Sequence, residues 1–281
     1  MKRQDALIRR VAEVQELLTL STPQATDTIK KAAYLLQNHE PPPPILHITG
    51  RSGSGVSTVA QGIYLSLRTD DGGVFIMPQT GIDPGLPPIA RLLRHFGFEC
   101  TYEVLEVSAM NQLPAPVMNL AQMLGFSVVV VEDYLTGVAS PEQKRRHIDQ
   151  WKKLTAFPLN LKLVLAAPLD QVKHSWGNQE STLEHLHINE WEHGNLLSNY
   201  LDDLSCLCRE TLRLDAPFSN HMKEIHKLSK GNTAHMLIHI RQCAIHSILS
   251  NVSHIPYELF RLSLKELTES NARLYSQLTS V

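Results

Sequence analysis

The hydrophobic and polar positions change their period part-way along the chain. Before about residue 190, short β-branched apolar runs alternate with segments whose apolar residues recur every three or four positions, which predicts strands and helices respectively. After about residue 195 only the helical period remains. The predicted strands are 45–49, 73–77, 128–131 and 161–166, and the predicted helices are 5–20, 24–38, 57–67, 86–97, 114–124, 141–154, 195–212, 219–229, 233–250 and 256–267.

The four consecutive valines of 128–131 indicate how the strands pair. A continuous apolar run is typical of a strand that is covered on both faces, as in a parallel sheet. Strands that alternate with helices predict an α/β fold. We therefore expect an α/β core with a parallel sheet over residues 41–190, which begins with a stiff proline linker at 41–44. A helical extension over 1–40 precedes this core, and a helical lid over 191–281 follows it.

The composition argues against two classes of protein, those that coat nucleic acid by bulk charge and those that span a membrane. The chain has 281 residues, of which 43% are hydrophobic and 19% charged, and its net charge is −2. This balance argues against coating nucleic acid by bulk charge, although a local basic patch remains compatible with it. No apolar run approaches the roughly 20 residues that span a bilayer. The four cysteines are widely scattered, which is typical of a reducing compartment, so we expect a cytoplasmic protein without membrane contact.

A glycine-rich turn lies between the predicted strand 45–49 and the helix that follows it. Its residues match the phosphate-binding pattern G-x-x-x-x-G-K-[ST] except that Val56 replaces the lysine. Backbone N–H groups of such a turn, together with the helix N-terminus, form an anion cradle. The alternative is a plain glycine turn. The candidate nucleotide-binding residues are Gly50, Arg51, Ser52, Gly53, Ser54, Gly55, Val56, Ser57 and Thr58.

Two acidic residues, Glu132 and Asp133, follow the valine strand. In P-loop ATPases the corresponding Walker B strand ends in Asp-Glu, where the aspartate holds Mg²⁺ and the glutamate polarises water. Here the order is reversed. We take Glu132 and Asp133 as candidate catalytic residues, and Ser57 and Glu132 as candidate ligands of a nucleotide-bound Mg²⁺. The alternative is that both acids are ordinary surface residues at a strand end.

The order of several short motifs along the chain resembles the TniB and TnsC family, AAA+ regulators of transposition that are related more distantly to MuB. Each motif is short, but together they extend over roughly residues 20–265. The matching segments are Ile45-Leu46-His47-Ile48-Thr49-Gly50, Val74-Phe75-Ile76-Met77-Pro78, Ala139-Ser140-Pro141-Glu142-Gln143-Lys144-Arg145-Arg146 followed by Leu154, Leu163-Val164-Leu165-Ala166, Asn189-Glu190-Trp191, Leu228-Ser229-Lys230-Gly231-Asn232-Thr233 and Ala244-Ile245-His246.

The resemblance implies a fold and a set of partners. Members of this family have an AAA+ fold, bind ATP, assemble as rings or filaments on duplex DNA, recruit a transposase and communicate with a target-selection protein. It therefore implies duplex DNA, a transposase and a target-selection protein as partners. It also implies self-association, or co-assembly with an active relative.

The chain departs from the family pattern at four charge-stabilising positions. Val56 replaces the Walker A lysine, and the Glu132-Asp133 pair reverses the Walker B order. The sensor strand ends in Ala166-Ala167-Pro168, and the segment 179–186, where the family carries an arginine finger, contains no arginine. Phosphoryl transfer depends on positioning and electrostatics, and an arginine finger alone contributes about 10³–10⁵ in rate. We therefore expect weak or absent hydrolysis, with nucleotide acting as a structural ligand.

Other interpretations remain open at the level of sequence. One is an active ATPase in which Arg51 supplies the missing positive charge, and another is a signalling switch unrelated to transposition. A basic stretch with Lys144, Arg145 and Arg146 lies on one predicted helix and could contact DNA phosphates. A solvated helix face is the alternative for that stretch.

Overall fold

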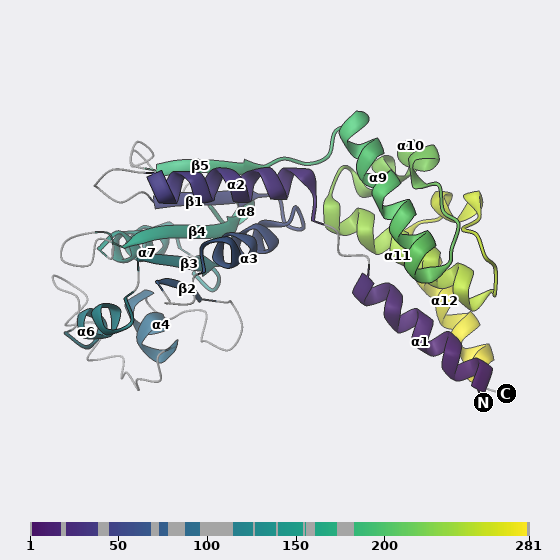
Figure 1. Cartoon of the computed structure of the whole chain (residues 1–281), viewed down its shortest axis with the longest axis horizontal. Helices are drawn as coiled ribbons and strands as arrows, with labels where there is room; N and C mark the ends of the chain where they lie inside the picture. The colour runs from purple at the N-terminus through teal and green to yellow at the C-terminus, as the bar shows by residue number, and fades with distance from the viewer. Residues whose placement is uncertain are drawn as a thin grey trace. The chain divides into compact units, whose positions relative to one another are not determined.

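The computed structural model describes residues 2–17, 21–38, 45–68, 73–77, 88–95, 115–125, 127–138, 140–153, 155, 161–172 and 183–279. These residues form an α/β part followed by a run of helices (Figure 1). The elements are α1 (Lys2–Leu17), α2 (Pro23–Asn38), β1 (Ile45–Gly50), α3 (Val56–Leu67), β2 (Val74–Met77), α4 (Pro88–His95), α6 (Ala115–Met123), β3 (Val128–Glu132), α7 (Pro141–Lys153), β4 (Lys162–Pro168), α8 (Leu169–Val172), β5 (Leu183–Ile188), α9 (Asn195–Leu207), α10 (Met222–Ser229), α11 (Thr233–Leu249) and α12 (Leu264–Thr279).

The sheet has five parallel strands in the order β2-β3-β4-β1-β5. The four predicted strands are all present, and the fifth, β5, was not predicted. Leu186 and Ile188 of β5 are buried, whereas the intervening His185 and His187 are exposed. This alternation is the pattern of a strand with one buried face, but six residues gave a weaker signal than the valine run of β3.

Apolar side chains fill the space between the sheet and two helices, α2 and α3. Every second strand residue faces these helices because side chains alternate across a strand. The intervening strand residues are mostly buried as well, so both faces of the central strands are covered. The residues of this sheet–helix core include Ala25, Ala32, Leu36, Leu46, Ile48, Val56, Val59, Ala60, Ile63, Val128, Val130, Val164, Ala166, Leu186 and Ile188.

The chain divides into two compact units. The sheet unit contains Gln24–Asn189, and the helical unit contains Met1–Pro23 together with Glu190–Val281. This differs from the single N-terminal extension that we expected over residues 1–40. Helix α2 buries Ala32 and Leu36 in the sheet–helix core, whereas α1 buries Val14 among the C-terminal helices. The two amphipathic helices are therefore neighbours in sequence that pack on different cores.

Two motifs that lie 40 residues apart in sequence meet in the helical unit. The Trp191 N–H donates to the Gly231 carbonyl oxygen at 2.8 Å, and the indole N–H of Trp191 donates to the Thr233 hydroxyl at 3.1 Å. Gly231 has φ +73°, and a Cβ at this position would overlap the Trp191 carbonyl oxygen. His226 Nε2 lies 2.8 Å from the same oxygen. Position 231 therefore requires glycine, because its φ is unfavourable for other residues and because a Cβ would have no room.

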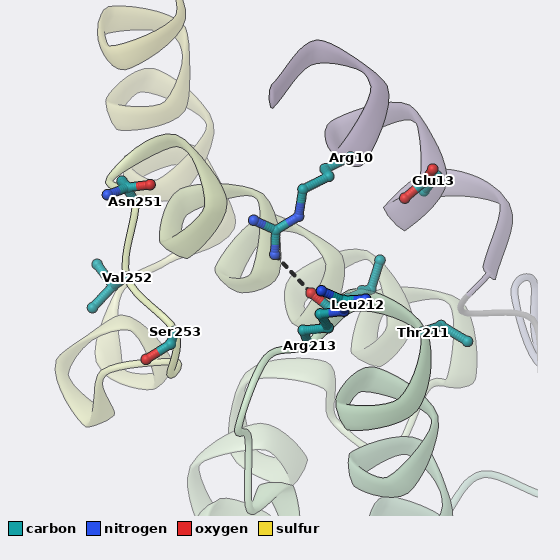
Figure 2. A pocket seen from close by; sticks show the side chains of 8 residues that line it. All are labelled: Arg10, Glu13, Thr211, Leu212, Arg213, Asn251, Val252 and Ser253. Carbon is teal, nitrogen blue, oxygen red and sulfur yellow. Dashed lines mark hydrogen bonds between the residues drawn. The ribbon is translucent and has the colours of Figure 1, made fainter. Parts of the chain in front are cut away.

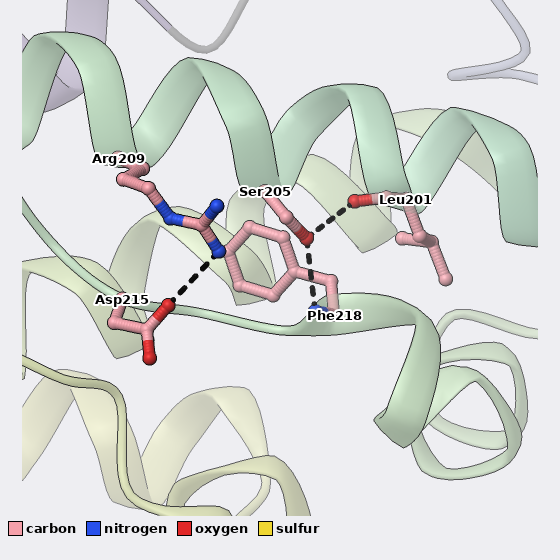
Figure 3. A network of polar contacts seen from close by, with 5 residues as sticks. All are labelled: Leu201, Ser205, Arg209, Asp215 and Phe218. Carbon is pink, nitrogen blue, oxygen red and sulfur yellow. Dashed lines mark hydrogen bonds and ion pairs between the residues drawn. The ribbon is translucent and has the colours of Figure 1, made fainter.

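A buried serine connects α9 to the segment after it (Figure 3). Ser205 donates its hydroxyl to the Leu201 carbonyl at 2.7 Å and accepts from the Phe218 N–H at 3.0 Å. Nearby, Arg209 and Asp215 form an exposed ion pair with 3.1 Å between nitrogen and oxygen. Helix α9 continues into a π-helical turn that ends at Leu212, so the predicted helix over 195–212 is one continuous helical segment with a change of period.

Helix ends follow the local sequence in two places. The Ser140 hydroxyl accepts from the Gln143 N–H at 3.1 Å and so caps the N-terminus of α7. At the C-terminus, Ser263 and Glu266 form a reciprocal cap that begins α12. The last predicted helix, 256–267, was misplaced: residues 257–261 form a short 3₁₀ helix and the long helix begins only at 264.

Candidate functional site

The glycine-rich turn lies where a phosphate cradle requires it. Strand β1 ends at Gly50, the turn follows, and α3 begins at Val56. Gly53 and Gly55 have φ of +83° and +103°, values that glycine adopts without the steric cost of a side chain. The Ser54 N–H donates to the Arg51 carbonyl at 2.9 Å, which closes the turn. Strand, turn and helix N-terminus are thus in the order that presents backbone N–H groups to an anion.

One side chain of the cradle points inward. Ser54 is 3% exposed, and its hydroxyl is buried without a hydrogen-bond partner among the described residues. A Cβ at Gly50 would overlap that hydroxyl and would lie 3.1 Å from the Ile188 carbonyl oxygen. Gly50 is therefore required so that Ser54 can fold back over the end of β1. The Ser54 hydroxyl is therefore a buried polar group that lies over the end of β1, without a partner among the described residues.

Val56 is part of the apolar core. Its side chain is 7% exposed and packs in the sheet–helix core described above. The position that carries the phosphate-binding lysine in the sequence pattern therefore contributes packing and no charge. Ser57 and Thr58, by contrast, are exposed on the first turn of α3, and Arg51 and Ser52 are exposed on the turn itself.

Glu132, the last residue of β3, and Asp133, which follows it, lie at the same edge of the sheet as the cradle, because all five strands are parallel. Glu132 pairs in register with Ala166 of β4, which pairs in turn with Ile48 of β1. Two strand spacings of about 4.8 Å place the Glu132 backbone about 10 Å from β1. Gln61 of α3 hydrogen-bonds the Glu132 carboxylate, which connects this acid to the helix that the turn begins.

Glu132 and Asp133 differ from ordinary surface acids. Glu132 is 6% exposed, and its Oε1 has no partner among the described residues. Burial raises the pKa of Glu132, the hydrogen bond from Gln61 opposes this shift, and the neighbouring Asp133 adds to it. Asp133 has φ +45°, a left-handed conformation that is uncommon outside glycine.

Arg91 of α4 is a buried arginine whose charge acts on Asp133. It is 4% exposed, and its Nε has no hydrogen-bond partner among the described residues. Burial raises the pKa of Asp133, and the nearby Arg91 guanidinium partly reverses this shift. Sequence reasoning missed Arg91, since the segment Pro88–His95 reads as an ordinary amphipathic helix and only the tertiary structure shows the arginine to be buried.

His147 lies on α7, which packs against the helix α4 that carries Arg91. Burial and the positive charge of Arg91 together lower the pKa of His147 to about 4. Its Nδ1 is also buried without a partner among the described residues. Arg91, Asp133 and His147, with Glu132, form what we call the β3-end cluster: four buried or half-buried titratable groups from β3, α4 and α7.

Three basic residues of α7, Lys144, Arg145 and Arg146, differ in their exposure to solvent and in their partners. Lys144 is half-buried and donates to the Gln171 carbonyl at 2.6 Å. Arg146 forms an exposed ion pair with Glu142 at 2.7 Å. Arg145 is exposed. The structure therefore does not bring Lys144, Arg145 and Arg146 together as one uniform surface.

A polar network of a different kind connects β1 with its neighbour β5 and with Tyr134, which follows β3. His47 of β1 is fully buried, and its two ring nitrogens lie 2.9 Å from the Tyr134 hydroxyl and 3.3 Å from His185 Nδ1. Burial and the adjacent His185 lower the pKa of His47 to about 3. Thr49 and His187 make a parallel contact at 3.0 Å. Within the described residues no group of three or more histidine, cysteine or acidic side chains is arranged to hold a metal ion.

The helical unit has a polar pocket of about 480 Å³ between α1 and the ends of two other helical segments (Figure 2). Arg10 lines it and donates to the Leu212 carbonyl at 2.6 Å, which holds α1 against the π-helical turn. The remaining lining residues are Glu13, Thr211, Arg213, Asn251, Val252 and Ser253. Cations and hydroxyls are mixed here with one carboxylate, so the pocket has no single sign of charge.

The sensor strand and the arginine-finger segment are the two remaining places where the sequence departs from the family pattern. The sensor strand ends in Ala166 and Ala167, which are buried and offer no polar side chain. Of the segment 179–186, where an arginine finger was sought, residues 179–182 lie outside the described residues, and 183–186 belong to β5. Across the helices that the structure describes, none is long and apolar enough to cross a bilayer.

Comparison with known proteins gives one informative result. No family model matches the chain, and no curated protein sequence does. The fold is similar to a chain of the structure of Drosophila ORC bound to DNA, with a TM-score of 0.61 and 12% sequence identity over 92% of this chain. The protein has an AAA+-like fold. The match covers 66% of the ORC chain, so this protein spans just under two thirds of that chain's length.

The AAA+-like fold confirms the predicted fold class. The parallel sheet, the glycine turn between β1 and α3 and the C-terminal helices are the parts on which that prediction depended. At 12% identity the likeness concerns the fold and does not assign a family within it.

Proposed function

We propose that this chain is a DNA-associated AAA+-type adaptor in transposition, in which nucleotide bound at the glycine turn orders the protein and is turned over slowly or not at all. It would stand between target selection and the transposase, and would assemble with itself or with an active relative. The motif resemblance to TniB and TnsC supports the transposition role. The structural likeness to a chain of DNA-bound ORC supports an association with duplex DNA.

The environment of Val56 is the observation that carries the proposal. The turn and the N-terminus of α3, whose backbone N–H groups would bind phosphate, are both present. The lysine position is instead part of the apolar core, 7% exposed. A lysine in this place stabilises charge on the transferred phosphoryl group. Without that charge the site can hold a nucleotide more readily than it can accelerate hydrolysis.

The test is to measure ATP binding and hydrolysis by the purified chain and by a Val56→Lys variant, each with and without duplex DNA. We expect the unmodified protein to bind ATP with negligible turnover. Val56→Lys should bind ATP more tightly, because the ammonium then neutralises phosphate. It should also unfold at a lower temperature without ATP, since a buried lysine loses its hydration. Val59→Ala, a core change without charge, is the matched control for loss of stability.

Rapid hydrolysis by the unmodified protein would overturn the structural-ligand proposal. It would favour the active ATPase instead, in which the exposed Arg51 of the turn supplies the charge. An Arg51→Ala variant would then lose the activity.

Duplex DNA binding is tested separately at low ionic strength, where phosphate contacts are strongest. Binding of a labelled duplex that weakens steeply with salt is expected. Arg145→Ala tests the part of α7 that is exposed, with Lys144→Ala as a comparison because Lys144 is half-buried against Gln171. No binding at low salt, with or without ATP, would overturn the DNA-associated role.

A further inference from the structure

The polar pocket of the helical unit is formed by segments that lie far apart in sequence (Figure 2). Helix α1 supplies Arg10 and Glu13, the end of the π-helical turn supplies residues 211–213, and the segment after α11 supplies residues 251–253. The volume of the pocket is about 480 Å³. A ligand in this pocket would therefore contact both the first helix of the chain and the segments that follow α9 and α11.

The helix ends beside the pocket are already hydrogen-bonded. The Leu212 carbonyl oxygen accepts from the Arg10 guanidinium at 2.6 Å. The Ser247 carbonyl oxygen, near the end of α11, accepts from the Val252 N–H at 2.9 Å. Helix C-termini attract cations through carbonyl groups that have no partner. Because these carbonyls are paired, the charge of the pocket is decided mainly by its side chains.

Two guanidinium groups line the pocket, those of Arg10 and Arg213. Among the lining residues that the structure describes, the carboxylate of Glu13 is their only negative charge, and its Oε1 lies 3.6 Å from Arg9 Nε. The hydrogen bond to the Leu212 carbonyl orients Arg10. No hydrogen bond or ion pair joins the Arg213 side chain to another described residue. Positive charge therefore exceeds negative charge in the pocket, and the Arg213 guanidinium is available to a ligand.

Uncharged donors add to these two cations. The Ser253 hydroxyl and the Asn251 amide line the pocket, and neither is hydrogen-bonded to another described residue. A phosphate monoester carries a charge of about −1.5 to −2 near neutral pH and has three strong acceptor oxygens. A carboxylate carries a single charge on two oxygens. The monoester therefore matches two guanidiniums and two further donors better than a carboxylate does.

We propose that this pocket binds a small organic phosphate monoester, whose phosphate lies between Arg10 and Arg213, and that the bound ligand fastens α1 to the C-terminal helices. Guanidiniums bind phosphate oxygens through paired N–H groups, which makes two of them a suitable phosphate clamp. The pocket exists only while α1 is docked, so binding shifts α1 towards the docked state. This site is independent of nucleotide at the glycine turn, which belongs to the sheet unit.

The experiment titrates the full chain with glycerol 3-phosphate at low ionic strength by calorimetry, with inorganic phosphate as a second probe. Hydrogen exchange with and without glycerol 3-phosphate locates the site. Arg213→Gln removes an exposed guanidinium without a described partner, so the variant should fold normally, which circular dichroism checks. Arg273→Gln is the matched control, because Arg273 is an exposed arginine of α12 outside the pocket lining. Glu13→Gln removes the carboxylate.

We expect glycerol 3-phosphate to bind and to slow exchange in α1 and in residues 211–213 and 251–253. Arg213→Gln should lose about tenfold or more in affinity, the effect of one charge-assisted contact to phosphate. Arg273→Gln should stay within about twofold of the unmodified protein. Glu13→Gln should bind about twofold or more tightly, because a like charge near the phosphate is removed. Inorganic phosphate should bind about threefold or more weakly, since it lacks the organic part that fills the pocket.

Five results would overturn the inference. They are absence of binding at low ionic strength, equal affinities of Arg213→Gln and Arg273→Gln, and equal binding of the two probes, which would make free phosphate the ligand. Protection confined to residues 50–58 would assign the phosphate to the glycine turn, and would support the proposed nucleotide site while excluding this one. Displacement of glycerol 3-phosphate by a DNA duplex without terminal phosphates would assign the pocket to the DNA backbone.

Discussion

In the glycine-rich turn, the environment of each residue decides whether its side chain can act as the phosphate-binding motif predicts. Val56 occupies the lysine position of a phosphate-binding motif, yet its side chain is part of the packing between α3 and the sheet. Ser54, which the motif leaves unspecified, has the buried unpaired hydroxyl inside the turn. The match to the motif therefore does not tell which side chains of the turn are buried and which, like Ser57 and Thr58, are exposed.

Gly231 gives a prediction at this scale. Gly231→Ala should lower the free energy of unfolding of the helical unit by at least about 3 kcal/mol. Alanine would have to adopt a left-handed φ, and its Cβ would also clash with backbone atoms. The clash is with the Trp191 carbonyl oxygen, and φ is +73°. Urea unfolding followed by tryptophan fluorescence measures the change.

Gly194→Ala is the control for that change. A Cβ at Gly194 meets no atom within 4 Å, and its φ of 173° is ordinary extended backbone. It should cost less than about 1 kcal/mol. Equal effects of the two substitutions would contradict the steric explanation.

At the scale of elements, neighbouring strands decide the ionisation of buried side chains. His47 lies in the centre of β1, and His185 of β5 is its partner in the strand register. On the other side of the ring, the hydroxyl of Tyr134, from the segment after β3, lies 2.9 Å from His47 Nε2. Neutral His47 satisfies both contacts, since one ring nitrogen accepts and the other donates. Protonation would leave a buried cation beside a second histidine.

Stability should therefore depend on pH through His47. Its pKa is lowered to about 3 in the folded protein, against 6.5 in the unfolded chain. Protons then bind the unfolded state preferentially, so stability is complete above pH 6.5 and is lost as pH falls from 6.5 towards 3. His47 contributes at most about 1.4 kcal/mol per pH unit over that range. Urea unfolding of the sheet unit at several pH values measures this slope.

His47→Gln should flatten the pH dependence below 6.5, because glutamine keeps polar contacts and does not titrate. His193→Gln replaces an exposed histidine of the helical unit and controls for the loss of one imidazole. An unchanged slope in His47→Gln would assign the acid sensitivity to other groups, such as His147, whose pKa is also lowered.

At the scale of the whole molecule, the chain crosses from one compact unit to the other twice. Helix α1 is part of the helical unit although the sheet unit follows it in sequence. Its attachment there consists of Val14 in the core, with Leu7 and Val11 partly buried, and of the hydrogen bond from Arg10 to Leu212. The first residues of the chain therefore contribute to the stability of its C-terminal helices.

Val14→Ala tests this arrangement by hydrogen exchange. Val14 is fully buried, so the cavity should destabilise the helical unit by about 1–3 kcal/mol. Faster exchange is expected in α1 and α11, which pack together, with no change in β1, β3 or β4. Ile8→Ala is the control, because Ile8 is 40% exposed. Faster exchange in the sheet strands would contradict the assignment of α1 to the helical unit.

The sequence by itself determined the class of fold and the position of the cradle. The valine run of β3, the glycine turn between a strand and a helix, and the loss of strand signals after residue 195 are local patterns, and local geometry follows from them. The shorter alternation of β5 and the late start of α12 were missed, because short segments carry little periodic signal.

Only the tertiary structure decided which charges are buried together. Arg91 comes from α4, Asp133 from the end of β3 and His147 from α7, and no sequence spacing relates these three. The same holds for α1, whose amphipathic pattern predicted an apolar face but not the core that covers it. Periodicity depends on neighbours in sequence, whereas burial and the environment of a charge depend on neighbours in space, which the folding of the whole chain brings together.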